Sequence, residues 1–323
     1  MAEALLGIDL GGTLVKTALV SRDKKILAKD ARPTAAHEGL DAVLDVIVAS
    51  VEAVLASGGR GREDVLAACV GAPGPSNPHT GVVFSPPNLP GWKDVPLAEL
   101  MTERLGIRCC VDNDANLACY GEFWLGAGQG TQSMCLLTLG TGVGGGIIVF
   151  GRLLHGIDGT AAEIGHMIVQ RDGRPCGCGA RGCLEAYGSV TGMVQTAVEG
   201  MEGGRKTVLS DRCAGNPETL TGEMISEVAA AGDEFATWVI QETGAWLGVG
   251  ISSLINLFNP EKIVLAGGMT KAGPVLLDAI RARALHDAFD VPAKRVEIVT
   301  AALEGDSGVL GAAGLALEGL ESE

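Results

Sequence analysis

Residues 134–150 read MCLLTLGTGVGGGIIVF: an apolar run, a turn with five glycines among eight residues, and a second apolar run. The same order occurs at residues 5–20, LLGIDLGGTLVKTALV, where Asp9 precedes the turn. Apolar runs on both sides of a glycine-rich turn predict β-hairpins. Two such hairpins in one chain predict a duplicated α/β unit.

The second turn also matches GxGxxG through Gly140, Gly142 and Gly145, with Glu163 following at the distance of a ribose-binding carboxylate. A dinucleotide-binding enzyme is therefore an alternative. A Rossmann fingerprint should open a helix, whereas IIVF at 147–150 predicts a strand. The sequence also holds no GxxxxGK[ST] motif, so any phosphate must be bound by the glycine turns, whose N–H groups can approach phosphate oxygens closely.

Helices and strands alternate in the rest of the chain. Apolar residues recur at intervals of three and four over 40–55 and predict an amphipathic helix, and 65–72 predict a buried strand. A long helix is expected over 235–258, with strands at 262–268 and 296–301. Because 323 residues exceed what one core usually serves, two domains or lobes are expected.

The segment VDNDAN at 111–116 follows a predicted strand and precedes a helical run. Asp and Asn are preferred N-cap residues, so helix capping alone could explain it. A carboxylate at a strand end beside a phosphate site could also accept the proton of an attacking hydroxyl. We expect Asp114 to be this base and Asn113 to bind a neighbouring hydroxyl.

One histidine and three cysteines form a metal-type pattern, His166 with Cys176, Cys178 and Cys183. One imidazole and three thiolates complete a tetrahedral zinc site and leave no position for a catalytic water. A structural zinc is therefore predicted. Glu163 and Glu185 bracket the pattern, and both could accept hydrogen bonds from a polyol.

Composition limits the partners and the location. Twenty-four basic against thirty-nine acidic residues give a net charge of −15, which disfavours binding to nucleic acid. No run approaches the eighteen apolar residues that a membrane span needs, and the first residues do not read as a signal peptide. These features predict a soluble, cytoplasmic protein that binds neither nucleic acid nor membrane.

Seven motifs, taken together and in this order, resemble the ROK family, and among its members the bacterial-type glucokinases. They are DLGGT at 9–13, GAPGP at 71–75, NDAN at 113–116, LGTGVGGG at 139–146, EIGH at 163–166, CGCGARGCLE at 176–185 and AGGM at 266–269. The resemblance implies an α/β fold of the duplicated actin-like ATPase (ribonuclease H-like) type, with two lobes around a nucleotide and sugar cleft. It implies a small lobe of residues 1–115 with the C-terminal helix 303–323, and a large lobe of 116–302 with the zinc-binding loop 163–185.

By motif position, the resemblance also implies roles for individual residues. Asp114 corresponds to the family's catalytic base. The sugar ligands would be Gly74, Asn113, Asp114, Glu163, His166 and Glu185, with His166 binding both zinc and sugar. The ATP-binding positions would be Gly11, Gly12, Thr13, Thr141, Gly142, Gly267 and Gly268, and Asp9 would organise Mg²⁺. Ala162 departs from the family, which more often has Gly there.

The implied activity is ATP-dependent phosphorylation of a hexose, chiefly glucose to glucose 6-phosphate, with ATP, Mg²⁺ and structural Zn²⁺. N-acetylmannosamine, N-acetylglucosamine, fructose or mannose are alternative substrates, because the named hydroxyl ligands would serve them all. A sugar-sensing regulator is a further alternative, which the charge and the absence of a helix-turn-helix before Gly7 disfavour. The resemblance also implies a dimer or tetramer.

Overall fold

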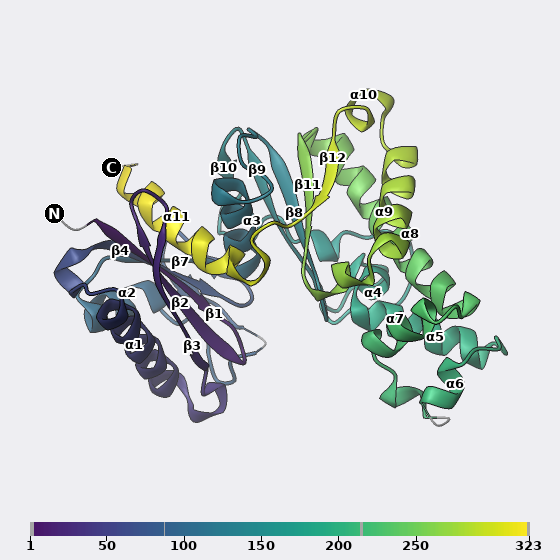
Figure 1. The fold of residues 1–323 in the computed structure, drawn as a ribbon, viewed down its shortest axis with the longest axis horizontal. Helices are drawn as coiled ribbons and strands as arrows, with labels where there is room; N and C mark the ends of the chain where they lie inside the picture. The colour runs from purple at the N-terminus through teal and green to yellow at the C-terminus, as the bar shows by residue number, and fades with distance from the viewer. Residues whose placement is uncertain (1–2, 87, 214–215, 322–323) are drawn as a thin grey trace. The chain divides into compact units, whose positions relative to one another are not determined.

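The computed structural model describes residues 3–86, 88–213 and 216–321. The other residues of the predicted lobes, 1–2, 87, 214–215 and 322–323, lie outside the described part. The chain forms two compact units, drawn in Figure 1. Unit 1 comprises residues 1–131, 146–162 and 301–323, and unit 2 comprises residues 132–145 and 163–300.

The sheet of unit 1 has the strand order β3-β2-β1-β4-β7. Its strands are β1 (Ala4–Leu10), β2 (Leu14–Ser21), β3 (Ile26–Pro33), β4 (Val65–Ala72) and β7 (Cys109–Asn113). β2 pairs with β1 and β3 in antiparallel fashion, whereas β1, β4 and β7 run parallel. The predicted first hairpin and the strand at 65–72 are therefore present.

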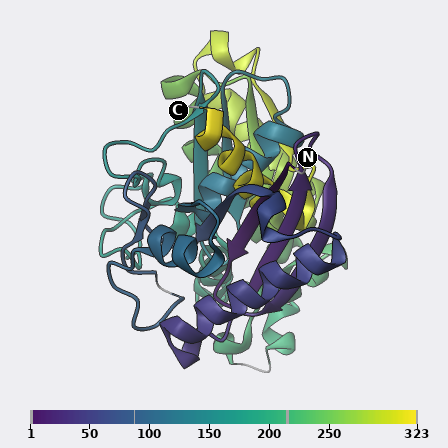
Figure 2. The same ribbon diagram turned by 90° about the vertical axis from the view of Figure 1, so that its left-hand side faces the viewer.

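Both faces of the sheet are buried at its central strands β1 and β4, whose sequences are nearly continuously apolar. Leu6 and Ile8 point to one face, in a core shared with α1 (Leu40–Ser57), which lies along the sheet in Figures 1 and 2. Leu5 belongs to the core of the opposite face, with α11 (Ser307–Glu321). Alternation along β1 thus divides the apolar side chains between two helical layers.

The second sheet has the order β10-β9-β8-β11-β12. Its strands are β8 (Met134–Leu139), β9 (Val143–Val149), β10 (Arg152–Leu153), β11 (Lys262–Ala266) and β12 (Glu297–Thr300). When the strands of each sheet are numbered by their order in the chain, both sheets have the spatial order 3-2-1-4-5. This shared topology confirms the predicted duplication. The turn is shorter than predicted, because β9 begins at Val143 and includes three of the five glycines. A strand and not a helix follows Gly142, as predicted against a Rossmann fingerprint.

The remaining elements are helices and two short strands. Unit 1 also holds β5 (Ser76–Asn77), β6 (Val82–Val83), α2 (Leu97–Leu105) and α3 (Asp114–Leu125). Unit 2 holds α4 (Glu185–Gly188), α5 (Val190–Glu202), α6 (Leu209–Arg212), α7 (Gly222–Ala230), α8 (Glu234–Phe258), α9 (Pro274–Asp287) and α10 (Asp290–Ala293). Among the described residues, none of the helices has the length and apolar character needed to cross a membrane.

The compact units differ in extent from the predicted lobes, because α3 and residues 146–162 belong to unit 1. The buried carboxylate of Glu122 on α3 contributes to this grouping. It accepts hydrogen bonds from the N–H groups of Ala127, Ala302 and Leu303, each at 2.9 Å, and from the Ser307 hydroxyl at 2.8 Å. One side chain thus ties α3 to the segment that leads into α11.

Glycines let α3 and α11 pack backbone to backbone. A Cβ on Gly311 would lie 1.8 Å from the carbonyl oxygen of Leu117, and one on Gly121 would lie 2.1 Å from that of Ser307. We therefore expect Gly311→Ala to destabilise the protein by about 3 kcal/mol or more, since backbone cannot yield locally. Gly319→Ala on the same helix is the matched control, because in the described part of the chain no atom outside the local helix backbone lies within 4 Å of its Cβ position. Chemical denaturation measures both, and equal midpoints would contradict the contact.

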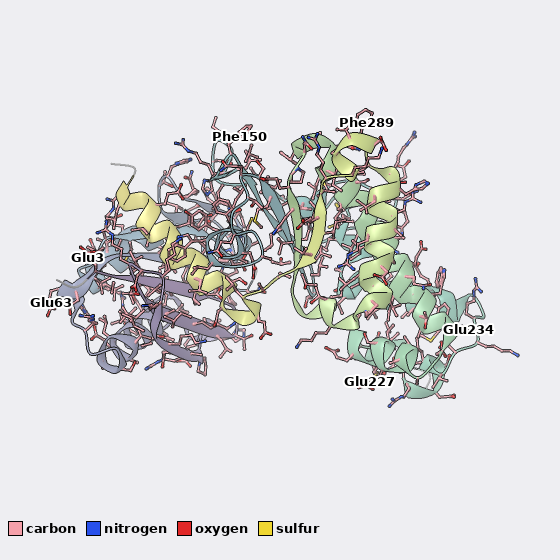
Figure 3. The ribbon with its side chains drawn as sticks, turned by 45° about the horizontal axis from the view of Figure 1, so that its top comes forward. Glu3, Glu63, Phe150, Glu227, Glu234 and Phe289 are labelled. Atoms are coloured by element: carbon pink, nitrogen blue, oxygen red, sulfur yellow. The ribbon has the colours of Figure 1, made fainter. Side chains whose placement is uncertain are left out.

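The exposed apolar side chains of the described residues do not identify an oligomer interface. Phe150, 83% exposed, follows β9, and Phe289, 70% exposed, precedes α10; both are labelled in Figure 3. They belong to different units. Single exposed apolar residues are common on soluble proteins, so the expected dimer or tetramer stays a prediction.

Candidate active site and metal centre

The β1–β2 turn of unit 1 carries Asp9, Gly11, Gly12 and Thr13. The Gly11 N–H donates to the carbonyl of Leu14 at 2.9 Å, which closes a tight turn. A Cβ on Gly12 would lie 2.7 Å from Cβ of Asn88, so this position has no room for a side chain. Burial raises the pKa of Asp9, and the charge of Lys16 opposes that shift.

Parallel pairing brings the ends of three strands to one level. Asp9 pairs with Gly71 on β4, and Gly71 pairs with Asp112 on β7. Asp114 follows β7 directly, and Gly74 lies two residues after the end of β4. The carboxyl ends of parallel strands are where α/β proteins bind ligands, so unit 1 gathers its predicted residues at such an edge.

The predicted base lies in a turn that its neighbours fix on both sides. Asn113 is the N-cap of α3: its Oδ1 accepts from Ala115 N at 2.9 Å and from Asn116 N at 3.3 Å, while its Nδ2 donates to Gly74 O at 2.9 Å. Asp114 opens the helix and accepts from Ala115 N at 2.8 Å. Asn113 therefore caps α3, as the capping interpretation predicted. The catalytic role of Asp114 and the sugar-binding role of Asn113 stay predictions.

A histidine that the sequence analysis left unassigned belongs to this group. Nε2 of His155 lies 2.7 Å from Oδ2 of Asp112, whose side chain is only 3% exposed. A single histidine outside any recurring spacing gives no signal in one sequence. Only the pairing of strands with the loop after β10 brings these two side chains together.

In unit 2 the second glycine turn and the predicted adenosine turn lie side by side. Val190 N donates to Gly140 O and Thr191 Oγ1 donates to Thr141 O, both at 2.9 Å, so the start of α5 supports the turn. Gly267 has φ of 96°, and a Cβ there would lie 2.3 Å from Leu139 O. Only glycine allows this approach. Thr141, Gly142, Gly267 and Gly268 thus lie at one edge of the second sheet.

The predicted metal ligands converge. One donor atom from each of His166, Cys176, Cys178 and Cys183 lies within 4.8 Å of every other. Sγ of Cys178 and Sγ of Cys183 are 3.7 Å apart, and Sγ of Cys176 is 3.7 Å from Nδ1 of His166. Zn–S bonds of about 2.3 Å in a tetrahedron place sulfurs about 3.8 Å apart, so these positions fit zinc.

The chemistry of the donor set agrees with this fit. Burial and the neighbouring sulfurs raise the pKa of the Cys183 thiol to about 12, so a thiolate there at neutral pH needs a bound cation. Nδ1 of His166 faces the sulfurs, which leaves Nε2 for another partner. Histidine with one nitrogen on a metal commonly donates through the other.

Of the two flanking glutamates, Glu185 contacts a neighbouring segment, whereas Glu163 makes a backbone hydrogen bond within the loop. Glu185 opens α4, and its Oε2 accepts from Val143 N at 3.0 Å, beside Gly142. Its Oε1 lies 3.8 Å from Sγ of Cys176. The carbonyl of Glu163 accepts from His166 N at 3.0 Å. Glu185 therefore connects the metal group to the phosphate-type turn within unit 2.

Two further residues, which the sequence analysis did not single out, hold the metal loop. Gly182 has φ of 81°, and a Cβ there would lie 1.7 Å from Gln170 O. The guanidinium of Arg174 donates to the carbonyls of Ala186 and Gly192, both at 3.1 Å. These contacts fix a loop that contains few apolar side chains. The predicted residues thus form two groups, one in each unit.

Comparisons with known proteins agree with this fold and these motifs. The ROK family model matches residues 5–319. A glucokinase from Halalkalibacterium halodurans is 38% identical over 312 residues, 95% of this chain and 92% of that protein. A ROK family glucokinase from Streptomyces griseus, solved with glucose and AMPPNP, has a TM-score of 0.79 at 34% identity and covers 98% of this chain and 99% of that one.

A regulatory protein has a similar fold. A ROK family transcriptional regulator, described as a homologue of the E. coli MLC protein, has a TM-score of 0.84 at 26% identity. The match covers 99% of this chain and 79% of that one. The family assignment and the actin-like ATPase fold in two lobes, expected from the motifs, are confirmed. The chain belongs to the ROK family.

Proposed function

We propose that this protein is an ATP-dependent hexose kinase that converts glucose to glucose 6-phosphate in the cytoplasm. The observation that carries the proposal is Asp114, placed at the first position of α3 and at the carboxyl edge of the sheet, after the Asn113 cap. The similarity to glucokinases over nearly the whole chain supports the same activity.

The proposed reaction assigns the base and the polyol acceptors to the residues that the family motifs identify. Asp114 accepts the proton of the sugar 6-hydroxyl as this oxygen attacks the γ-phosphorus, and ADP leaves. Asn113 and the peptide at Gly74, joined by their 2.9 Å hydrogen bond, bind a neighbouring hydroxyl. Glu163, His166 through Nε2, and Glu185 accept or donate to the other hydroxyls.

Phosphate binding falls to the two glycine turns. Backbone N–H groups of Gly11, Gly12 and Thr13, and of Thr141 and Gly142, are proposed to donate to phosphate oxygens, while Gly267 and Gly268 contact the adenosine. Mg²⁺ bound with the nucleotide supplies positive charge to the phosphoryl oxygens, and Asp9 would hold its water shell. The zinc group is proposed to be structural, since its four donors complete the metal's coordination.

A panel of hexoses tests the proposal. With Mg·ATP, we expect kcat/KM for glucose to exceed that for mannose, fructose, N-acetylglucosamine and N-acetylmannosamine by about tenfold or more. The expectation that glucose is preferred comes from the similarity to glucokinases, since the hydroxyl ligands alone do not distinguish these sugars. Coupled detection of ADP and of the sugar phosphate measures both products. Tight glucose binding without ADP formation would contradict a kinase and favour a regulator.

A further inference from the structure

The carboxylate of Asp112 is the centre of a hydrogen-bond network around the proposed base. Its side chain is 3% exposed. Oδ1 accepts from Asn113 N at 2.7 Å and from Asn116 Nδ2 at 2.9 Å, and Oδ2 contacts His155 Nε2 at 2.7 Å. Because an ionised carboxylate only accepts, Nε2 of His155 carries the hydrogen.

The two donors to Oδ1 lie on either side of Asp114 in the chain. Fixing the backbone N–H of Asn113 and the side chain of Asn116 therefore fixes the turn from which the Asp114 carboxylate projects. The Asn113 side chain is held separately, by Gly74 and by the N-terminus of α3. Loss of the Asp112 contacts should consequently disturb Asp114 more than the proposed sugar contact of Asn113.

His155 is itself held by the loop after β10. Its carbonyl accepts from Ala161 N at 3.1 Å, and Gly159 in the same loop lies so close to β5 that a Cβ would be 2.3 Å from Ser76 O. The imidazole is 23% exposed, so this contact is largely shielded from water. A buried Asp112 oxygen deprived of its histidine would be left unpaired, which is costly.

We propose that His155 is a positioning residue for phosphoryl transfer, which acts by donating to Asp112 and so holding the Asp112–Asn116 turn in the orientation that Asp114 needs. The inference rests on the proposed role of Asp114. Displacement of a catalytic group by about 1 Å can reduce the rate about 100-fold. The contact between His155 and Asp112 can therefore change the rate of phosphoryl transfer, although neither side chain is the base.

The charge of His155 provides a readout of this coupling. Burial opposes its charged form, but the hydrogen bond and the negative charge of Asp112, helped by Glu318 of α11, raise the pKa of His155 above its usual value. His79, after β5, is its aromatic neighbour, with ring centroids 6.2 Å apart. The charged pair is fully formed below the ordinary histidine pKa of about 6.5 and is lost as the pH rises through the folded pKa.

Three variants test the proposal in the full-length protein. We expect His155→Ala to lower kcat about 10- to 100-fold while the glucose Kd changes less than about threefold. His155→Gln, whose amide donates but does not titrate, should keep kcat within about threefold of wild type. His79→Ala is the matched control and should behave as wild type. Wild-type kcat in His155→Ala, or equal losses in the alanine and glutamine variants, would overturn the proposal.

A second measurement does not depend on turnover. In ¹⁵N NMR spectra we expect the amide of Asn113 to shift with the titration of His155 in the wild type and in Asp114→Asn, and not in His155→Gln. A pH-independent Asn113 amide while His155 titrates would overturn the coupling, even if His155→Ala did not fold. Absence of hexose phosphorylation by the wild type would instead refute the proposed function, and the amide titration would still decide whether His155 holds this turn.

Discussion

Asp114→Asn is expected to lower kcat for glucose phosphorylation by about 10²- to 10⁴-fold, the usual contribution of a general base. The amide is nearly the same size but cannot accept the hydroxyl proton. The cap of α3 does not depend on this side chain, because Asn113 supplies it. The variant should therefore fold normally and bind glucose with a Kd within about threefold of wild type, as isothermal titration calorimetry would measure.

The matched control is Asp45→Asn on α1, an aspartate whose side chain is 72% exposed and pairs with Arg104. It removes the same charge from unit 1 without touching the turn at 112–116, and should leave kcat unchanged. A near wild-type kcat for Asp114→Asn would show that another group accepts the proton. The loss of glucose binding in that variant would mean that Asp114 serves the ground state instead.

Zinc removal is expected to have the largest effect on stability. Purified protein should contain about one zinc per chain, and Cys178→Ser should lose most of it. The Cys178 thiol is exposed, so by ordinary packing its replacement would change the free energy of unfolding by less than about 0.5 kcal/mol. A structural zinc ligand should instead cost several kcal/mol, which lowers Tm by roughly 10 °C.

Cys110→Ser, on β7 and outside the metal group, is the matched control, and its zinc content should equal that of wild type. Strong chelation should lower the Tm of wild type and leave that of Cys178→Ser nearly unchanged. Zinc-free protein that melts at the same temperature with and without chelator would refute the metal centre. The same holds if Cys178→Ser retains both zinc and Tm.

The elements with strong periodic patterns could be predicted from the sequence. The helix expected at 40–55 is α1, the strand at 65–72 is β4, and the long helix at 235–258 is α8. β3 was not predicted, because Lys29, Asp30 and Arg32 interrupt its apolar residues on an edge strand that water reaches. Edge strands carry such charges to discourage further pairing, which weakens their apolar signal.

Some features of the candidate site could likewise be predicted from local sequence, and others could not. The spacing of the histidine and the three cysteines is typical of a metal site, so the local sequence was enough to predict that these four residues lie together. Ala162, noted for departing from the family glycine, adopts a φ of 64°, the left-handed region that favours glycine. His155 and Asp112 lie 43 positions apart in the sequence, and Gly121 and Gly311 are farther apart still. Their contacts depend on strand and helix packing, which no local pattern encodes.

A crystal structure of Asp114→Asn with glucose and AMPPNP would test the central claim most directly. The account predicts that the glucose 6-hydroxyl lies within about 3 Å of the residue 114 side chain, with its oxygen in line with the γ-phosphorus. Glucose bound with its 6-hydroxyl beyond hydrogen-bond reach of residue 114, or pointing away from the γ-phosphorus, would contradict it.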